Sequence, residues 1–156
     1  MSTNKNKKSF SLTEIMISIL VLVVGISGGI AVLNGIVNNF RLATDTFIAD
    51  NLAVEGIEIV RNIRDSNLTA GRAWNHGLAV GNYQADFNDL SLIGHTDGVL
   101  NRNAFFEHAT GISTPFRRRI EIISCGVECL EIRSIITWVS FVETERIIAA
   151  IKLFRH

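Results

Sequence analysis

One acidic residue lies alone in the most apolar part of the chain. Glu14 is the only charged residue in residues 10–40, and 26 uncharged residues separate it from Arg41. A carboxylate in a membrane-spanning helix costs about 2.5–3.5 kcal/mol on insertion scales and usually marks a function. Its chemistry would be charge pairing, but residues 10–40 contain no cation. The partner must therefore come from outside this segment, unless Glu14 lies at the level of the lipid headgroups and has no further role.

The two cysteines form the second candidate site. Cys125 and Cys129 are close in the sequence and are its only cysteines. An isolated close pair fits one disulfide in an oxidising compartment, which would staple a short loop. Two free thiols are the alternative. A zinc site is not expected, because no other cysteine or nearby histidine completes a ligand set.

Catalytic patterns are missing from the sequence. Its four histidines, His76, His95, His108 and His156, have no metal-ligand spacing. Serine, histidine and aspartate occur without a recognisable triad or nucleophile elbow, and no glycine loop matches a phosphate-binding motif. We therefore expect a protein that is not an enzyme and has no catalytic residue, metal or cofactor.

Arginine occurs in one run, Arg117–Arg118–Arg119. Because side chains alternate along a strand, Arg118 would point away from the other two, so the run predicts a solvated strand and no one-sided patch for nucleic acid. The segment Asn67-Leu68-Thr69 matches a glycosylation sequon, a pattern that also occurs often by chance.

Composition and charge distinguish two segments before residue 41, a basic one at 1–9 and an apolar one at 10–40. The chain is 47% hydrophobic and has one proline, so it is too apolar for a disordered protein. Residues 1–9 are polar and basic, and residues 10–40 are long and apolar enough to cross a bilayer as a helix. The lysines before this segment predict that its N-terminal end faces the cytoplasm and that the rest of the chain lies outside the inner leaflet.

Helical periodicity continues past Arg41. Over residues 41–66 apolar residues recur mostly every three to five positions, which indicates an amphipathic helix. A sheet-facing stripe is expected, and Gly56 within it would let the sheet approach closely. The stripe consists of Phe40, Ala43, Phe47, Leu52, Gly56, Val60 and Ile63.

The rest of the chain predicts a loop and a sheet. Residues 67–115 are rich in Gly, Asn and Asp, with one short strand expected at 82–87. Residues 116–156 contain three β-branched runs, 116–124, 130–142 and 146–155, joined by short gaps that favour antiparallel hairpins. The predicted fold is α+β: a long N-terminal helix, transmembrane in its first half and amphipathic in its second, packed on a C-terminal antiparallel sheet.

The segment KKSFSLTEIMISILVLVVG (7–25) resembles the processing site of type IV pilins and type II secretion pseudopilins. In that family a basic leader ends in a small residue, usually Gly. The mature chain then begins with Phe, and a Glu follows four positions later. Ser9, Phe10 and Glu14 match these positions, with Ser9 replacing the glycine. Residues 51–67 are similar to a segment that follows the helix in many pilin-like proteins.

This resemblance implies cleavage between Ser9 and Phe10 by a prepilin peptidase, and N-methylation of Phe10. It also implies a structural subunit of a pilus or pilus-like filament. The subunit would be held in the cytoplasmic membrane as a precursor, with its C-terminal domain outside, and assembled on an inner-membrane platform into a cell-surface filament. Its partners would be membrane lipid, copies of itself or other pilin subunits, and nucleic acid only in a DNA-uptake pilus. The new amine of Phe10 on one subunit would pair with Glu14 of its neighbour.

The glycine pair in the apolar segment and the function of the chain can each be interpreted in more than one way. Gly25 and Gly29 form a G-x-x-x-G pair that permits close helix packing, or they weaken the helix so that it melts during assembly. An uncleaved single-pass membrane protein with an extracytoplasmic ligand-binding domain is the main alternative function. A secreted domain behind an ordinary signal peptide ranks lowest, because helical periodicity continues past the apolar run.

Overall fold

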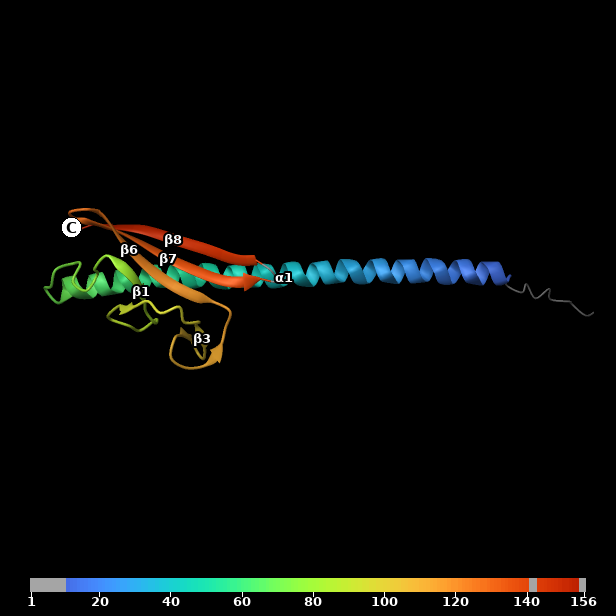
Figure 1. Ribbon diagram of the computed structural model, residues 1–156, viewed down its shortest axis with the longest axis horizontal. Coiled ribbons are helices and arrows are strands. Elements are labelled where there is room, and N and C mark those ends of the chain that lie inside the picture. The colour runs from blue at the N-terminus through green and yellow to red at the C-terminus, as the bar shows by residue number, and fades with distance from the viewer. Residues whose placement is uncertain (1–10, 141–142, 155–156) are drawn as a thin grey trace, which may run out of the picture. The chain divides into compact units, whose positions relative to one another are not determined.

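The computed structural model describes residues 11–140 and 143–154, which form one helix and two antiparallel sheets (Figure 1). The chain divides into two compact units, Met1–Leu42 and Ala43–His156. Helix α1 (Leu12–Thr69) contributes to both units, and in the second its buried face packs on the sheet. The predicted α+β fold, a long N-terminal helix and antiparallel sheets, is confirmed at this level.

The larger sheet has the strand order β2-β1-β6-β7-β8, with every neighbouring pair antiparallel. Its long strands are β6 (Arg117–Gly126), β7 (Cys129–Ser140) and β8 (Glu143–Phe154). They confirm the three β-branched runs expected from the sequence. Strand β1 (Gly81–Gln84) pairs with β6 and corresponds to the short strand expected at 82–87, and β2 (Ile93–Gly94) forms the far edge.

A second, three-stranded sheet occupies the region that the sequence predicts as a loop. Its order is β4-β3-β5, formed by β3 (Asn101–Arg102), β4 (Phe106–Glu107) and β5 (Ile112–Ser113). Strands of two residues are too short to show an alternating pattern, so sequence periodicity could not reveal them. An apolar cluster fixes their position, because Leu100 is fully buried and Phe106 packs edge-to-face on Phe116 at 6.3 Å between ring centroids.

The buried stripe of α1 begins later than the sequence predicts. Leu52, Gly56, Val60 and Ile63 are buried as expected, but Phe40, Ala43 and Phe47 are exposed. Phe47 precedes the buried Ala49 by two residues, or about 200° around the helix, so it lies on the opposite face. The stripe that faces the sheet is made of Ala49, Leu52, Ala53, Gly56, Ile57, Ile59, Val60, Ile63 and Asn67.

One face of the sheet supplies the other half of the core. Strand β6 buries Ile120 and Ile122, and β7 buries every second residue from Leu130 to Trp138. Alternate residues of a strand point to opposite faces, so these side chains share the face toward α1. Burial of this apolar surface, at about 25 cal/mol per Å², is the main favourable contribution to the stability of the second unit.

The helix and the sheet approach each other closely at Gly56. A Cβ atom placed on Gly56 would lie 3.0 Å from the Cβ of Ser134 and would clash with its Oγ. Ser134 is fully buried, and its Oγ has no hydrogen-bond partner among the described residues. The prediction that Gly56 lets the sheet approach the helix closely is confirmed.

Arg118 corrects the prediction of a solvated arginine run. Its neighbours Arg117 and Arg119 face away from the helix, but the Arg118 side chain is completely buried. Its Nη1 donates to Oε1 of Glu55 at 2.8 Å, and its Nη2 donates to the carbonyl oxygen of Ala85 at 2.6 Å. The prediction that Arg118 points away from Arg117 and Arg119 was correct. The face to which Arg118 points is covered by α1, however, and therefore excludes water.

The end of the helix is stabilised by an asparagine side chain. Asn67 is 3% exposed, and its Nδ2 donates to the carbonyl oxygen of His76 at 2.7 Å. Gly71 follows with φ +67°, the left-handed conformation that commonly terminates a helix. The helix therefore ends at Thr69, three residues beyond the range 41–66 that the sequence predicts. The sequon match is explained as a structural asparagine, because a buried amide that bonds the following loop is not accessible to a glycan.

Candidate functional site

The first unit exposes a long and mostly apolar surface. Over its described residues it consists of α1 from Leu12 to Leu42, and every residue of this segment is exposed. Its large apolar side chains are between 38% exposed, for Leu42, and 75% exposed, for Leu12. The most apolar 18-residue window of α1 has a mean hydropathy of 2.7, so the helix is a candidate membrane span by length and composition. Such a surface requires lipid or other protein around it.

Ser11 directly precedes helix α1, and its side chain forms no hydrogen bond with Glu14. The backbone amides of Glu14 and Ile15 donate to the carbonyl oxygen of Ser11 at 3.0 and 3.2 Å. Ser11 and Glu14 have the spacing of a capping box, in which each side chain would accept from the other's backbone amide. Here the Ser11 hydroxyl instead bonds the Thr13 hydroxyl at 2.9 Å. The capping-box spacing is visible in the sequence, but its side-chain bonds are not formed.

Glu14 is the only charged side chain in the described part of the chain before Arg41. The Ser18 hydroxyl donates to the carbonyl oxygen of Glu14 at 2.8 Å, so it is satisfied within the helix. The Glu14 carboxylate has no ion pair or side-chain hydrogen bond with any residue that the structure describes. Any partner of the Glu14 carboxylate must therefore come from outside the described residues of this chain.

Gly25 and Gly29 lie within the continuous helix. A Cβ placed on either residue would meet no neighbouring atom within 4 Å in the single chain. The helix-packing role expected for them therefore concerns a second molecule and stays a prediction. Ser9 and Phe10, to which the predicted cleavage and N-methylation belong, lie outside the described residues.

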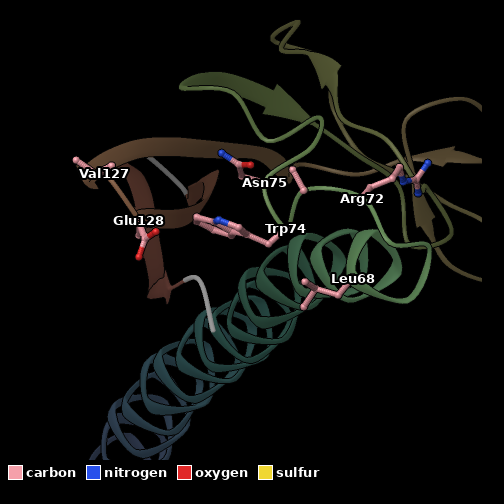
Figure 2. A pocket seen from close by; sticks show the side chains of 7 residues that line it. Leu68, Arg72, Trp74, Asn75, Val127 and Glu128 are labelled. Atoms are coloured by element: carbon pink, nitrogen blue, oxygen red, sulfur yellow. The ribbon is translucent and has the colours of Figure 1, made fainter.

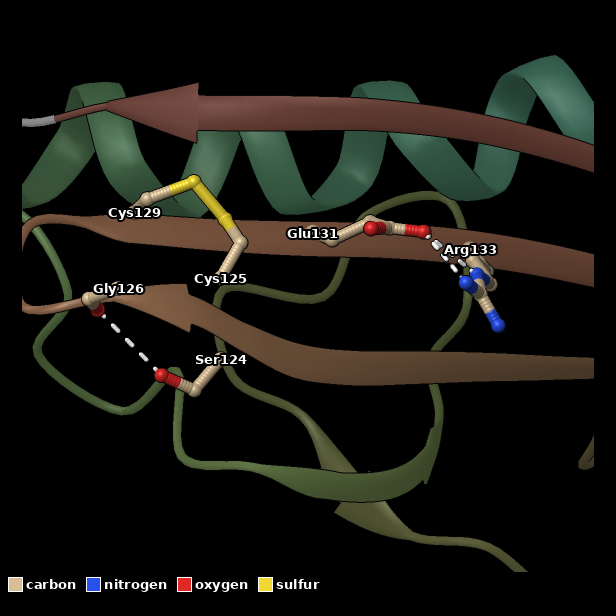
Figure 3. The surroundings of a disulfide bond; sticks show 6 residues. All are labelled: Ser124, Cys125, Gly126, Cys129, Glu131 and Arg133. Carbon is tan, nitrogen blue, oxygen red and sulfur yellow. Dashed lines mark hydrogen bonds and ion pairs between the residues drawn. A yellow bond between two sulfur atoms is a disulfide. The ribbon is translucent and has the colours of Figure 1, made fainter.

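Cys125 and Cys129 are joined by a disulfide at the turn between β6 and β7, with their Cα atoms 5.1 Å apart (Figure 3). The strand register shifts at the same place, between Ser124 and Gly126, where the Ser124 hydroxyl donates to the carbonyl oxygen of Gly126 at 3.3 Å. Further along β7, Glu131 and Arg133 form an ion pair of 2.7 Å. The disulfide therefore closes a turn between two strands that their backbone ladder already pairs.

A cavity lies between the end of α1 and this disulfide turn. It has a volume of about 480 Å³ and is lined by Leu68, Arg72, Trp74, Asn75 and Glu128, among others. Figure 2 shows Arg72 and Glu128 on opposite sides of Trp74, so the charged groups do not converge on one point. Over the described part of the chain, no cluster of His, Cys, Asp or Glu could hold a metal ion.

Comparison with known proteins gives no match to a protein-family model, a curated protein or a solved structure. The function of the chain must therefore be inferred from its own residues. Among them, the exposed apolar helix and its single unpaired carboxylate form the arrangement that most clearly needs another molecule.

Proposed function

We propose that the chain is a structural subunit of a type IV pilus or a pilus-like filament, processed by a prepilin peptidase and assembled through its N-terminal helix. The observation that supports this most directly is the apolar segment Leu12–Leu42, which is exposed along its whole length. Lipid covers such a segment in the precursor. In the filament, the same segments of neighbouring subunits cover one another, and the apolar surface stays out of water in both states.

The unpaired carboxylate of Glu14 supports a specific charge pair between neighbouring subunits. Cleavage before Phe10 creates an α-amine close to Glu14 in the sequence, and an α-amine can carry the positive charge that the segment lacks. The amine of one subunit pairs with Glu14 of its neighbour in a medium of low dielectric constant, where a charge pair is stronger than in water. Because one amine meets one carboxylate, the pairing also sets the axial position of each incoming subunit.

Intact-mass and N-terminal analysis of sheared cell-surface filaments tests this proposal. The expected product begins at Phe10, lacks residues 1–9 and has an additional methyl group at its N-terminus. Cells with an active prepilin peptidase that yield only the full-length chain would contradict the proposal. Cells that lack the peptidase provide the control, because they should retain the leader and form no filaments from this chain.

The cavity beside Trp74 supports one alternative, a single-pass membrane protein whose external domain binds a ligand. In that case the N-terminal helix is an anchor and keeps residues 1–9. The same mass measurement separates the two functions. The cavity is the weaker observation because its polar side chains lie apart, as Figure 2 shows.

A further inference from the structure

A group of arginines lies on the outer face of the five-stranded sheet, opposite α1. Arg117 of β6 is the register partner of Thr137 of β7, which is in turn the partner of Arg146 of β8. Arg119 lies two residues along β6 from Arg117 and therefore on the same face. Strand spacing of about 4.8 Å and a rise of about 3.3 Å per residue place all three guanidinium groups within reach of one point.

These side chains line a common cavity of about 90 Å³. His95 and Asp97 also line it, and the Nε2 atom of His95 lies 3.0 Å from Oδ1 of Asp97. Asp97 is 93% exposed, so water screens its charge. Arg118 contributes to the lining, but its guanidinium is bound to Glu55 on the helix side of the sheet.

The arginines of this cavity are not neutralised within the described chain. No described acidic side chain forms an ion pair with Arg117, Arg119 or Arg146, whereas Arg133, two residues from the cavity along β7, is paired with Glu131. Two buried polar atoms here, Arg119 Nε and His95 Nδ1, also have no hydrogen-bond partner among the described residues. The site thus has three positive charges against the one of Asp97, together with unused donors.

We propose that this cavity binds a phosphate group. A guanidinium group matches the oxygens of a phosphate with two parallel hydrogen bonds, and the Thr137 hydroxyl supplies a further donor. A volume of about 90 Å³ suits one phosphate group. No aromatic side chain lines the cavity in the described chain, so the site has no platform for base stacking. The site lies in the second unit and does not depend on the proposed filament role.

Titration calorimetry on the purified full-length chain in detergent micelles tests the site, with inorganic phosphate as the probe in a phosphate-free buffer. Arg119→Gln and Arg146→Gln should each weaken phosphate binding by about tenfold, because each removes a charged hydrogen-bond donor. Asp97→Asn should strengthen it only slightly, because water already screens the opposing charge that it removes. Arg119→Lys should bind with intermediate strength, because lysine keeps the charge and loses the two-pronged geometry.

Lys152→Gln is the matched control, since Lys152 is an exposed cation on β8 outside the cavity. Its phosphate affinity should stay within about twofold of the unmodified chain, because distant exposed charges are screened by salt. Failure of the unmodified chain to bind phosphate would overturn the site. So would an equal loss in Lys152→Gln and Arg146→Gln, which would show only a diffuse surface charge. Circular dichroism of each variant checks folding, and Arg146→Gln, at an exposed position, keeps the test valid if Arg119→Gln unfolds.

A second arm of the titration distinguishes the source of the phosphate. A short oligothymidylate presents phosphodiesters, whereas inorganic phosphate is the free ion. Competition between them, with loss of both in the arginine variants, assigns the site to phosphodiesters of a polymer. Binding of inorganic phosphate without competition assigns it to a free or terminal phosphate.

Discussion

Glu55 and Arg118 are 63 residues apart in the sequence and form an ion pair of 2.8 Å between helix and sheet. The two partners differ in their access to water, because the Arg118 side chain is completely buried and that of Glu55 is 34% exposed. Removing either partner therefore has a different consequence. Loss of Arg118 leaves a carboxylate that water can reach, whereas loss of Glu55 leaves a buried guanidinium with only the Ala85 carbonyl as a partner.

The first prediction follows from this asymmetry. Glu55→Ala should lower the free energy of unfolding by about 3–5 kcal/mol, the usual cost of leaving a buried charge unpaired. Arg118→Met, which fills similar space without a charge, should cost less. Chemical denaturation of the full chain in detergent, followed by tryptophan fluorescence, measures both changes.

Glu58→Gln is the control for this comparison. Glu58 lies one turn of α1 from Glu55 and pairs with Arg61 at 2.5 Å, but its side chain is 55% exposed. An exposed pair contributes at most about 1 kcal/mol, so this variant should unfold close to the unmodified chain. Equal destabilisation by Glu55→Ala and Glu58→Gln would show that burial of Arg118 is not what gives the pair its importance.

The second prediction concerns the contact between Gly56 and Ser134. Gly56→Ala should destabilise the second unit by about 1–3 kcal/mol, because the added methyl group overlaps the Ser134 side chain. On an exposed helix face the same substitution would stabilise by roughly 0.5–1 kcal/mol, so the sign of the change identifies the close contact. Thermal unfolding monitored by circular dichroism gives that sign.

A double-mutant cycle isolates the steric origin of this effect. Ser134→Gly removes the two nearest atoms that a Cβ at Gly56 would meet and leaves Arg118 Cδ at an ordinary contact distance of 3.4 Å, so Gly56→Ala should cost much less in that background. A cost that stays the same in both backgrounds would rule out Ser134 as the obstacle.

Strongly periodic elements could be predicted from the sequence. Strands β6, β7 and β8 consist of β-branched and apolar residues in runs that short gaps separate, and the close approach at Gly56 follows from its place in the helical stripe. The apolar segment that contains Glu14 was also evident, because a lone charge in an uncharged run is visible in the sequence itself.

Other features depend on tertiary contacts that a sequence pattern does not contain. In a sequence, an arginine that faces a helix cannot be distinguished from an arginine that faces water. The pairing of Arg118 with Glu55 was therefore not predicted. Phe47 was assigned to the buried stripe because it is apolar, yet it is 69% exposed. The two-residue strands β3, β4 and β5 are held by packing around Leu100 and Phe116, which local propensity does not report.

The third prediction concerns the buried amide of Asn67. Asn67→Ala should lower stability by about 1–3 kcal/mol, because the carbonyl oxygen of His76 loses its donor and a buried polar contact is removed. The native protein should also show no glycan on Asn67, which mass spectrometry of its peptides can check.

Thr69→Val is the matched control for the sequon, since it removes the acceptor motif while Asn67 keeps its hydrogen bonds. A glycan on Asn67, or a Thr69→Val variant as unstable as Asn67→Ala, would contradict the structural role.

The fourth prediction tests Glu14 directly. Glu14→Ala should leave membrane insertion intact, because it removes a carboxylate that costs about 2.5–3.5 kcal/mol in a bilayer. Filament assembly should fall by about tenfold or more, because each subunit contact loses a charge-assisted hydrogen bond of roughly 1.5–3 kcal/mol. Quantifying the chain in sheared-surface and membrane fractions separates the two effects.

Ser18→Ala is the control in the same helix, since the Ser18 hydroxyl is already bonded to the Glu14 carbonyl and needs no neighbour. Normal amounts of sheared filament from Glu14→Ala, in cells whose filaments require this chain, would show that the carboxylate has no partner on an adjoining subunit.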